Sequence, residues 1–305
     1  LRNTTIKGIA NCIRSCNDQS VVVLAGAGLS VAAGIPDFRT PGTGLYDNLQ
    51  RFHLPRPESV FDIEFFEENP QPFYELSREL YPGKVLPTKA HFFIRLLAEK
   101  NKLRRLITQN IDCLDRLAGV PDDKMIEAHG SFATATCRGC GKCYNQDWVA
   151  SKIFDEATIP VCPECGGIVK PDITFFGESL PVRYGRLHGQ DAKAAELLIV
   201  MGTSLEVQPV ASFPAQVDKL CPRLLINREA VFVEDPPPLE ASMALPSQGG
   251  FRFNLEDNYR DVFFQGDCDD GCDALAAELG WTEDFERLVA AERARLEEEF
   301  ASTKD

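Results

Sequence analysis

Long apolar runs are missing from this sequence of 305 residues. None approaches the roughly 18 residues that a membrane-spanning helix requires, so we expect neither a transmembrane segment nor a membrane partner. The sequence begins at Leu1 and shows neither a signal peptide nor an Arg-rich amphipathic leader. From these absences we expect a cytoplasmic protein, with the nucleus as a further location.

Basic residues are also in short supply. The sequence contains 32 lysines and arginines against 46 aspartates and glutamates, which gives a net charge of −14. Such a charge argues against direct binding of nucleic acid, because phosphate contacts require a basic surface. It suits a basic protein partner such as a Lys-rich tail. The alternative is that the acidity serves only solubility.

A disulfide framework is not expected. The cysteine count of 11 is odd, and the chain is far too long for a disulfide-stabilised miniprotein. This usage favours a reducing compartment and a role for cysteine in metal binding or thiol chemistry.

Four of the cysteines form two C-x2-C pairs, Cys137 with Cys140 and Cys162 with Cys165. Two such pairs complete a tetrahedral set of four thiolates for one Zn²⁺. No coordination position then remains open, so we expect a structural ion. Cys143 repeats the spacing, and Cys140 with Cys143 is an alternative first pair. A DNA-binding zinc ribbon is the rival interpretation, which the acidic charge disfavours.

Residues 21–24 form a β-branched apolar run, which predicts a strand buried on both faces. Gly26 and Gly28 follow at once and allow a tight turn with close approach to a ligand. We expect Ser30 to cap a short helix over residues 31–33. A strand, a glycine turn and a helix N-terminus make an anion site suited to phosphate. The alternative is an ordinary strand-to-helix turn.

The next residues place a carboxylate, an aromatic ring and a guanidinium side by side, in Asp37, Phe38 and Arg39. Core packing does not require this trio, so it favours a functional loop. Residues 40–57 continue as a long loop of the kind that often serves as a lid.

Strands and helices alternate over most of the chain, which predicts a doubly wound parallel sheet. The expected strands are 21–24, 103–108, 124–128, 173–176, 196–201, 223–226 and 261–265. The expected helices are 3–17, short helices within 58–81, 88–100 and two at the C-terminal end, the last of them solvated. Polar clusters follow five strands, at 26–30, 109–112, 202–204, 227–228 and 266–268. We expect them to meet at the ligand-binding edge of the sheet.

His129 is the one histidine of four in a suggestive place, after an expected strand and before a glycine. A neutral imidazole there can accept a proton near physiological pH. His53, His91 and His188 are interpreted as surface or core residues. The polar side chains of 109–112 can hold ribose hydroxyls or an amide, or can form an Asx turn that caps a helix near residue 113.

Taken together, these motifs resemble the sirtuins, a family of NAD-dependent protein-lysine deacylases. The motifs are Gly26-Ala-Gly-Leu-Ser30 with Gly34-Ile-Pro-Asp-Phe-Arg39, Thr108-Gln-Asn-Ile-Asp112, His129-Gly130, the two cysteine pairs, Lys170-Pro-Asp-Ile-Thr-Phe-Phe-Gly-Glu178 and Gly202-Thr-Ser204. Two later segments, 259–262 and 266–272, are similar to the cytosolic branch that contains a tubulin and histone deacetylase.

The resemblance implies a Rossmann-like NAD-binding domain and a smaller domain made of the four-cysteine zinc module and a helical module. The large domain would comprise residues 1–40, 84–130 and 172–305. The cofactor loop and helical module would span 41–83, and the zinc module 131–171.

The resemblance also implies a reaction and its residues. The acyl group of lysine would pass to the ADP-ribose of NAD, with release of nicotinamide and O-acyl-ADP-ribose. His129 would be the general base, with Asn110 as a second catalytic residue. NAD would contact Gly26, Ala27, Gly28, Leu29, Ser30, Val31, Asp37, Phe38, Arg39, Gln109, Asn110, Ile111, Asp112, Gly202, Thr203, Ser204, Asn227, Arg228, Glu229 and Cys268. The substrate strand would contact Phe175, Gly177, Glu178 and Val207.

Partners implied by the resemblance are acyl-lysine proteins such as tubulin or histone tails. Tyr74 is followed by Ser77 where relatives that remove acidic acyl groups have arginine, which favours acetyl and longer aliphatic groups. Thr174 stands where valine is common, and residues 234–258 match nothing in the family pattern. Mono-ADP-ribosylation of protein and a non-enzymatic NAD-sensing zinc scaffold are the alternative functions.

Overall fold

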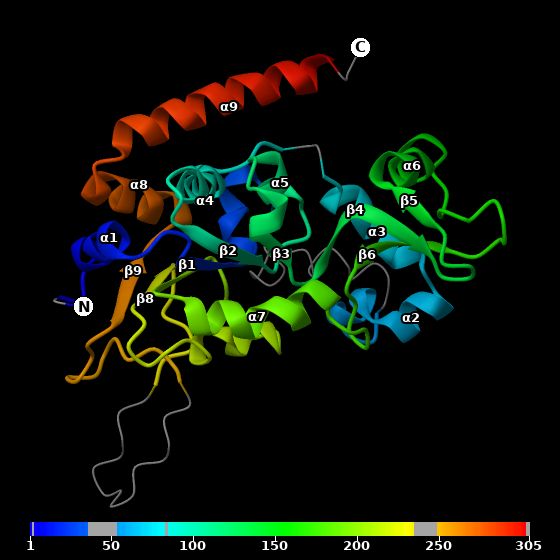
Figure 1. The fold of residues 1–305 in the computed structure, drawn as a ribbon. Coiled ribbons are helices and arrows are strands. Elements are labelled where there is room, and N and C mark those ends of the chain that lie inside the picture. Colours follow the sequence, from blue (N-terminus) through cyan, green and yellow to red (C-terminus); the bar gives the residue numbers. More distant parts are fainter. Residues whose placement is uncertain (2, 36–53, 83–84, 235–248, 303–305) are drawn as a thin grey trace, which may run out of the picture.

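The computed structural model describes residues 1, 3–35, 54–82, 85–234 and 249–302 (Figure 1). Its larger sheet has six strands, all paired in parallel. In spatial order they are β3 (Met125–Glu127), β2 (Leu103–Thr108), β1 (Val21–Ala25), β7 (Leu197–Met201), β8 (Arg223–Asn227) and β9 (Asp261–Gln265). The strand order changes direction between β1 and β7, which is where open sheets of this kind bind ligands.

The two central strands are buried along their whole length. Successive side chains alternate between the two faces of the sheet. Val21 and Val23 therefore belong to one hydrophobic cluster, and Val22 and Leu24 to another. An apolar run without polar alternation is what a strand covered on both faces requires.

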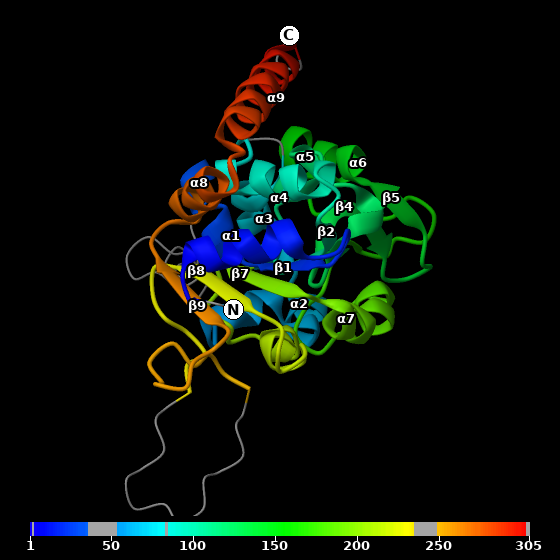
Figure 2. The same ribbon diagram turned by 60° about the vertical axis from the view of Figure 1, so that its left-hand side comes forward.

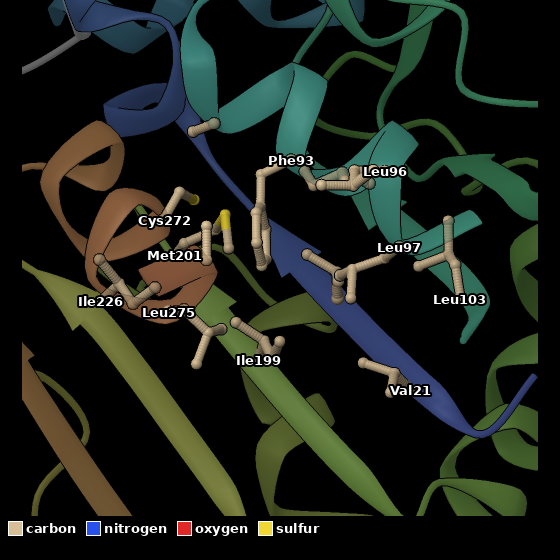
Figure 3. Packing of buried hydrophobic residues seen from close by; sticks show 14 of the residues in the cluster. Val21, Phe93, Leu96, Leu97, Leu103, Ile199, Met201, Ile226, Cys272 and Leu275 are labelled. Carbon is tan, nitrogen blue, oxygen red and sulfur yellow. The ribbon is translucent and has the colours of Figure 1, made fainter. Parts of the chain in front are cut away.

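Helices cover both faces of this sheet (Figures 1 and 2). One face carries α1 (Ile6–Ser15), α4 (Lys89–Glu99), α8 (Cys268–Leu279) and α9 (Thr282–Ser302). Figure 3 shows Phe93 and Leu97 of α4, with Leu275 of α8, packed over Val21 and Ile199. The other face carries α7 (Val182–Ala194) and the 3-10 segment Val210–Ala215. Short α5 (Leu114–Leu117) follows β2.

A smaller antiparallel sheet has the order β5 (Cys143–Asn145), β4 (Gly130–Cys137) and β6 (Val169–Ile173). It packs with α2 (Ile63–Glu68), α3 (Gln71–Leu80) and α6 (Gln146–Ala150) around one hydrophobic cluster. Edge-to-face contacts join Phe61, Phe66 and Phe73 to Phe175 at ring-centroid distances of 4.9–5.8 Å. The helical and cysteine-rich segments therefore share a core. The expected fold class is confirmed.

Two expectations about elements are wrong. The strand expected over 173–176 instead runs over Val169–Ile173 and pairs with β4, and Phe176 forms only an isolated bridge to Asp62. The last helix is not simply solvated, because Phe285, Val289 and Leu296 are buried. Within the described residues, no helix combines the length and apolar character needed to cross a membrane.

Candidate functional site

A cleft of about 670 Å³ opens at the carboxyl edge of the six-stranded sheet. All five polar clusters predicted for this edge contribute to its wall. The contributors from these clusters are Gly26, Ala27, Gly28, Gln109, Asn110, Ile111, Gly202, Thr203, Ser204, Asn227, Arg228, Gly266, Asp267 and Cys268. The predicted residues Val31 and Glu229 line it as well. The convergence expected from the parallel sheet is confirmed.

The glycine turn after β1 packs tightly on the loop after β7. Gly28 N–H donates to the Gly202 carbonyl at 2.7 Å, and a Cβ on Gly28 would lie 2.6 Å from Gly202 Cα. A Cβ on Gly26 would lie 2.7 Å from Thr203 Cβ. These glycines thus permit contact between two loops of the protein, in addition to any approach of a ligand.

The expected capping role of Ser30 is wrong. The segment Val31–Ala33 is a 3-10 turn, and the Ser30 side chain makes no capping hydrogen bond to it. Its hydroxyl instead donates to Asp112 Oδ2 at 2.5 Å and accepts from Asn110 Nδ2 at 3.2 Å. Ser30 therefore fastens the turn after β1 to the segment after β2.

Asp112 forms the Asx turn, which is one of the two alternatives that its sequence context left open. Its Oδ1 accepts the Leu114 amide at 2.9 Å, which is the Asx turn at the start of α5. Burial raises the pKa of Asp112, although the hydrogen bonds from Ser30 and Leu114 oppose that shift. Asp112 thus holds the Ser30 hydroxyl, which accepts from Asn110, and Asn110 lines the cleft wall.

Some predicted NAD contacts do not line the cleft. Leu29 and Ser30 are each 1% exposed, and Asp112 is 8% exposed; none of the three is on the wall. These three residues support the residues that line the wall. The predicted contacts Asp37, Phe38 and Arg39 lie outside the described residues.

His129 lines the cleft just after β3. Its Nδ1 lies 3.1 Å from the Gln109 carbonyl oxygen. A carbonyl can only accept, so Nδ1 carries the proton and Nε2 keeps its lone pair. Among the described residues Nε2 has no hydrogen-bond partner. Burial lowers the pKa of His129, which keeps the ring neutral at physiological pH.

Gln109 connects His129 to the loop that follows β7. Its Nε2 donates to Thr203 Oγ1 at 2.9 Å, and the same oxygen accepts the Leu205 amide at 3.1 Å. These hydrogen bonds join the segments that follow β2 and β7, the two strands on either side of β1.

The outer end of the cleft is more exposed. Asn227 Nδ2 donates to the Glu229 carbonyl at 2.9 Å, and Arg228 pairs with Asp267 at 2.6 Å. Cys268 lines the cleft but is 7% exposed, and burial raises the pKa of its thiol to about 12. It is therefore a packing residue with little thiolate character.

All four predicted substrate contacts line the cleft: Phe175, Gly177, Glu178 and Val207. Gly177 has φ +92, a left-handed conformation that suits glycine. In the described part of the chain its amide and carbonyl form no hydrogen bond. The neighbouring Phe176 is already paired, through the Phe61 carbonyl at 2.7 Å and the Ile63 amide at 3.1 Å.

Sequence reasoning missed several residues of the wall. They are Phe61, Ile173, Phe176, Leu180, Glu206, Gln208, Pro209 and Val231. Most are apolar, and in a sequence an apolar side chain that lines a cleft has the same signature as one in the core. Phe176 is 45% exposed, which only the structure reveals.

The sulfur atoms of Cys137, Cys140, Cys162 and Cys165 all lie within 4.8 Å of one another. The Cys137–Cys165 and Cys140–Cys162 separations are 3.4 and 3.7 Å. Tetrahedral Zn²⁺ with sulfur ligands at about 2.3 Å places the sulfurs roughly 3.8 Å apart, so the set fits zinc. Cys143 is exposed and is not part of the set, which decides between the two pairings left open by the sequence.

Comparison with known proteins gives a consistent result. The model of the Sir2 family matches residues 26–209. The chain is 47% identical to the NAD-dependent protein deacetylase sirtuin-2 of Danio rerio, over 100% of this chain and 80% of that protein. It is 44% identical to the NAD-dependent protein deacetylase sirtuin-3 of Mus musculus, over 96% and 81%. It is 42% identical to the NAD-dependent protein deacetylase hst2 of Schizosaccharomyces pombe, over 97% and 82%.

Proposed function

Since this chain belongs to the Sir2 family, we propose that it is an NAD-dependent protein-lysine deacetylase. The observation that carries the proposal is the position of His129, whose ring lines the same cleft as two groups of residues and whose Nε2 has no hydrogen-bond partner among the described residues. One group follows the strands of the large sheet, and the other is the segment 174–178. A base placed between a cofactor side and a peptide side is what the reaction requires.

NAD, when bound, supplies the ADP-ribose that accepts the acyl group and the nicotinamide that leaves. By the resemblance we assign its phosphates to the turn at residues 27–31, in which the amides of Gly28, Leu29 and Ser30 already donate to carbonyls of the protein. Asn110 and Gln109 would hold the ribose next to nicotinamide. Thr203, Ser204 and residues 227–229 would hold the adenosine half, with Cys268 packed beneath it. Asp37, Phe38 and Arg39 remain assigned by resemblance.

His129 would act as general base. The Gln109 carbonyl fixes the tautomer and the ring orientation, so that Nε2 accepts a proton from a ribose hydroxyl. The lowered pKa keeps this nitrogen unprotonated at physiological pH. The hydroxyl, once deprotonated, becomes the better nucleophile toward the acyl carbon.

The peptide would bind as an extended strand beside residues 175–178. The unpaired amide and carbonyl of Gly177 can pair with its main chain, and Val207 would close the opposite side. Recognition through main-chain groups tolerates many sequences, so acyl-lysine proteins such as tubulin or histone tails are proposed as substrates. The net charge of −14 supports a basic partner. A cytoplasmic or nuclear location follows from the same proposal.

We also propose the division into a Rossmann-like domain (1–40, 84–130, 172–305), a cofactor loop with helical module (41–83) and a zinc module (131–171). It is supported by the separate hydrophobic clusters of the large sheet and of the cysteine-rich part. The four thiolates would hold one structural zinc ion.

The test is mass spectrometry of an acetyl-lysine peptide incubated with the protein, with and without NAD. Loss of the acetyl mass only with NAD, together with formation of O-acetyl-ADP-ribose, is the expected result. Transfer of ADP-ribose to protein without deacetylation would contradict the proposal. So would binding of NAD with no release of nicotinamide for acetyl and longer acyl peptides alike.

A further inference from the structure

The carboxylate of Glu178 lies where the cysteine pairs, the helical module and the segment 174–178 meet. Its side chain is 22% exposed, and both of its oxygens are already engaged. Oε2 accepts Lys170 Nζ and the Phe175 amide, each at 2.9 Å. Oε1 pairs with Arg138 Nη1 at 3.4 Å. A carboxylate held on both oxygens by the protein is poorly placed to bind a ligand as well.

Glu178 instead shapes the main chain beside it. The Phe175 amide donates to its side chain, and the Glu178 amide donates to the Phe175 carbonyl at 3.0 Å. This closes a tight turn around Gly177, whose φ is +92. Because Phe175 is used in the turn and Phe176 is paired elsewhere, Gly177 is the residue of the described segment 174–178 whose amide and carbonyl are both unpaired.

Lys170 supports this turn from beneath. It is 4% exposed, and its ammonium also donates to the Ile173 carbonyl at 2.5 Å and lies 4.1 Å from the centre of the Phe175 ring. Burial lowers the pKa of Lys170, and the hydrogen bond with Glu178 opposes that shift. Without Glu178 the buried cation would lose the carboxylate with which it forms an ion pair.

Arg138 connects the turn to the metal site. It directly follows Cys137 in the sequence, and its side chain also pairs with Glu67 of α2 at 2.7 Å. Its amide donates to the Ile168 carbonyl at 2.8 Å. The position of Arg138 is therefore fixed by the fold of the cysteine pairs, and Arg138 in turn contacts Glu178.

We infer that Glu178 is a positioning residue for the peptide substrate, held by Lys170 and Arg138, so that the cysteine-pair region determines the affinity for the acyl-lysine strand. The inference rests on the proposed function. The Glu178 side chain orders the segment 174–178, and the main chain of Gly177 binds the peptide. The cofactor side of the cleft is not part of this network, so NAD affinity should be independent of it.

The first test is steady-state kinetics of Glu178→Gln and Arg138→Gln. We expect Glu178→Gln to raise the KM for an acetyl-lysine peptide about tenfold, with kcat and the KM for NAD changed by less than about twofold. Arg138→Gln should raise the peptide KM about threefold, and Arg138→Lys should restore it. In the double variant, Arg138→Gln should add less than about twofold to the effect of Glu178→Gln.

The matched control is Glu164→Gln, which removes an exposed ion pair with Lys142 between the same two cysteine pairs. Within the described residues no hydrogen bond or ion pair joins its side chain to the segment 174–178, so all three kinetic constants should stay unchanged. Zinc content is measured for every variant and should equal that of the parent. An unchanged peptide KM in Glu178→Gln would overturn the inference, as would a parallel rise in the KM for NAD.

A second readout does not depend on activity. Hydrogen exchange of the peptide that carries the Phe175 amide should accelerate at least about tenfold in Glu178→Gln and stay unchanged in Glu164→Gln. Equal exchange in both variants would show that Glu178 does not order the turn. If the parent protein deacetylates no peptide, the proposed function fails, while this exchange measurement still decides whether Glu178 positions the segment.

Discussion

The imidazole Nδ1 of His129 lies 3.1 Å from the carbonyl oxygen of Gln109, and this contact fixes which ring nitrogen is free to act as a base. Burial lowers the pKa of His129 below its ordinary value of 6.5. A general base must be unprotonated, so activity is lost only as the pH falls through this lowered pKa. We expect the acid limb of kcat against pH to have its midpoint below pH 6.5. Rates of deacetylation between about pH 5 and 8 provide the measurement.

His129→Ala is the companion variant. It should lose at least about 100-fold in kcat, while NAD still binds through the turn after β1 and the loop after β7. A variant that retains full deacetylation would disprove the role of base. A midpoint above pH 7 in the parent protein would disprove the electrostatic argument, even if the variant were inactive.

The cysteine quartet gives a prediction about metal content. Cys165→Ser removes one of the four clustered sulfurs, and we expect loss of the bound zinc and a lower melting temperature, because structural zinc contributes directly to folding. Cys143→Ser is the matched control, since Cys143 is exposed and outside the cluster. Zinc per chain is measured by atomic absorption. Loss of zinc from Cys143→Ser with retention in Cys165→Ser would reverse the assignment.

Much of this site was predictable because its signals are local. The buried strands β1 and β7 are continuous apolar runs, and the polar clusters follow the strand ends directly in the sequence. Parallel strands place their carboxyl ends at one edge, so convergence required no knowledge of distant contacts. The cysteine pairs were similarly evident from their spacing.

The remainder depended on partners far apart in the chain. Ser30 and Asp112 are 82 residues apart, and the Ser30 hydroxyl donates to that carboxylate instead of capping the turn at residues 31–33. Arg223 and Asp261 form a fully buried ion pair at 2.7 Å, although in a sequence such residues indicate a surface. The segment 173–176 has the composition of a strand, and only its tertiary contacts decide that the ladder ends at Ile173.

The packing of Gly28 on Gly202 leads to a prediction about stability. In Gly28→Ala the new Cβ would lie 2.6 Å from Gly202 Cα, so one of the two loops must shift. We expect a loss of about 1–3 kcal/mol in the free energy of unfolding and weaker NAD binding. The control is Gly185→Ala in α7, where a Cβ meets nothing within 4 Å. Alanine there should stabilise the protein by roughly 0.5–1 kcal/mol. Urea unfolding measures both; equal effects would contradict the argument.

His91 leads to a prediction about acid stability. It is fully buried at the third position of α4, and its Nδ1 accepts the Thr88 amide at 3.1 Å. Burial lowers the pKa of His91 from 6.5 to about 3. As the pH falls below 6.5, His91 becomes protonated in the unfolded chain but stays neutral in the folded chain. The free energy of unfolding, which is at its full value above pH 6.5, therefore decreases progressively. The titration of His91 alone should lower the free energy of unfolding by about 2 kcal/mol between pH 7.5 and pH 5.

His91→Gln separates this titration from the rest of the fold. Glutamine at the third position can still accept the Thr88 amide, as in the usual capping box, but it does not titrate. The variant should therefore lose about 2 kcal/mol less than the parent when urea unfolding is compared at pH 7.5 and 5. The variant should also be less stable than the parent at pH 7.5, because the packing of the buried imidazole is lost, but this does not affect the comparison between the two pH values. If parent and variant lose equal stability over this interval, the acid sensitivity arises from other groups, and His91 is not held neutral by burial.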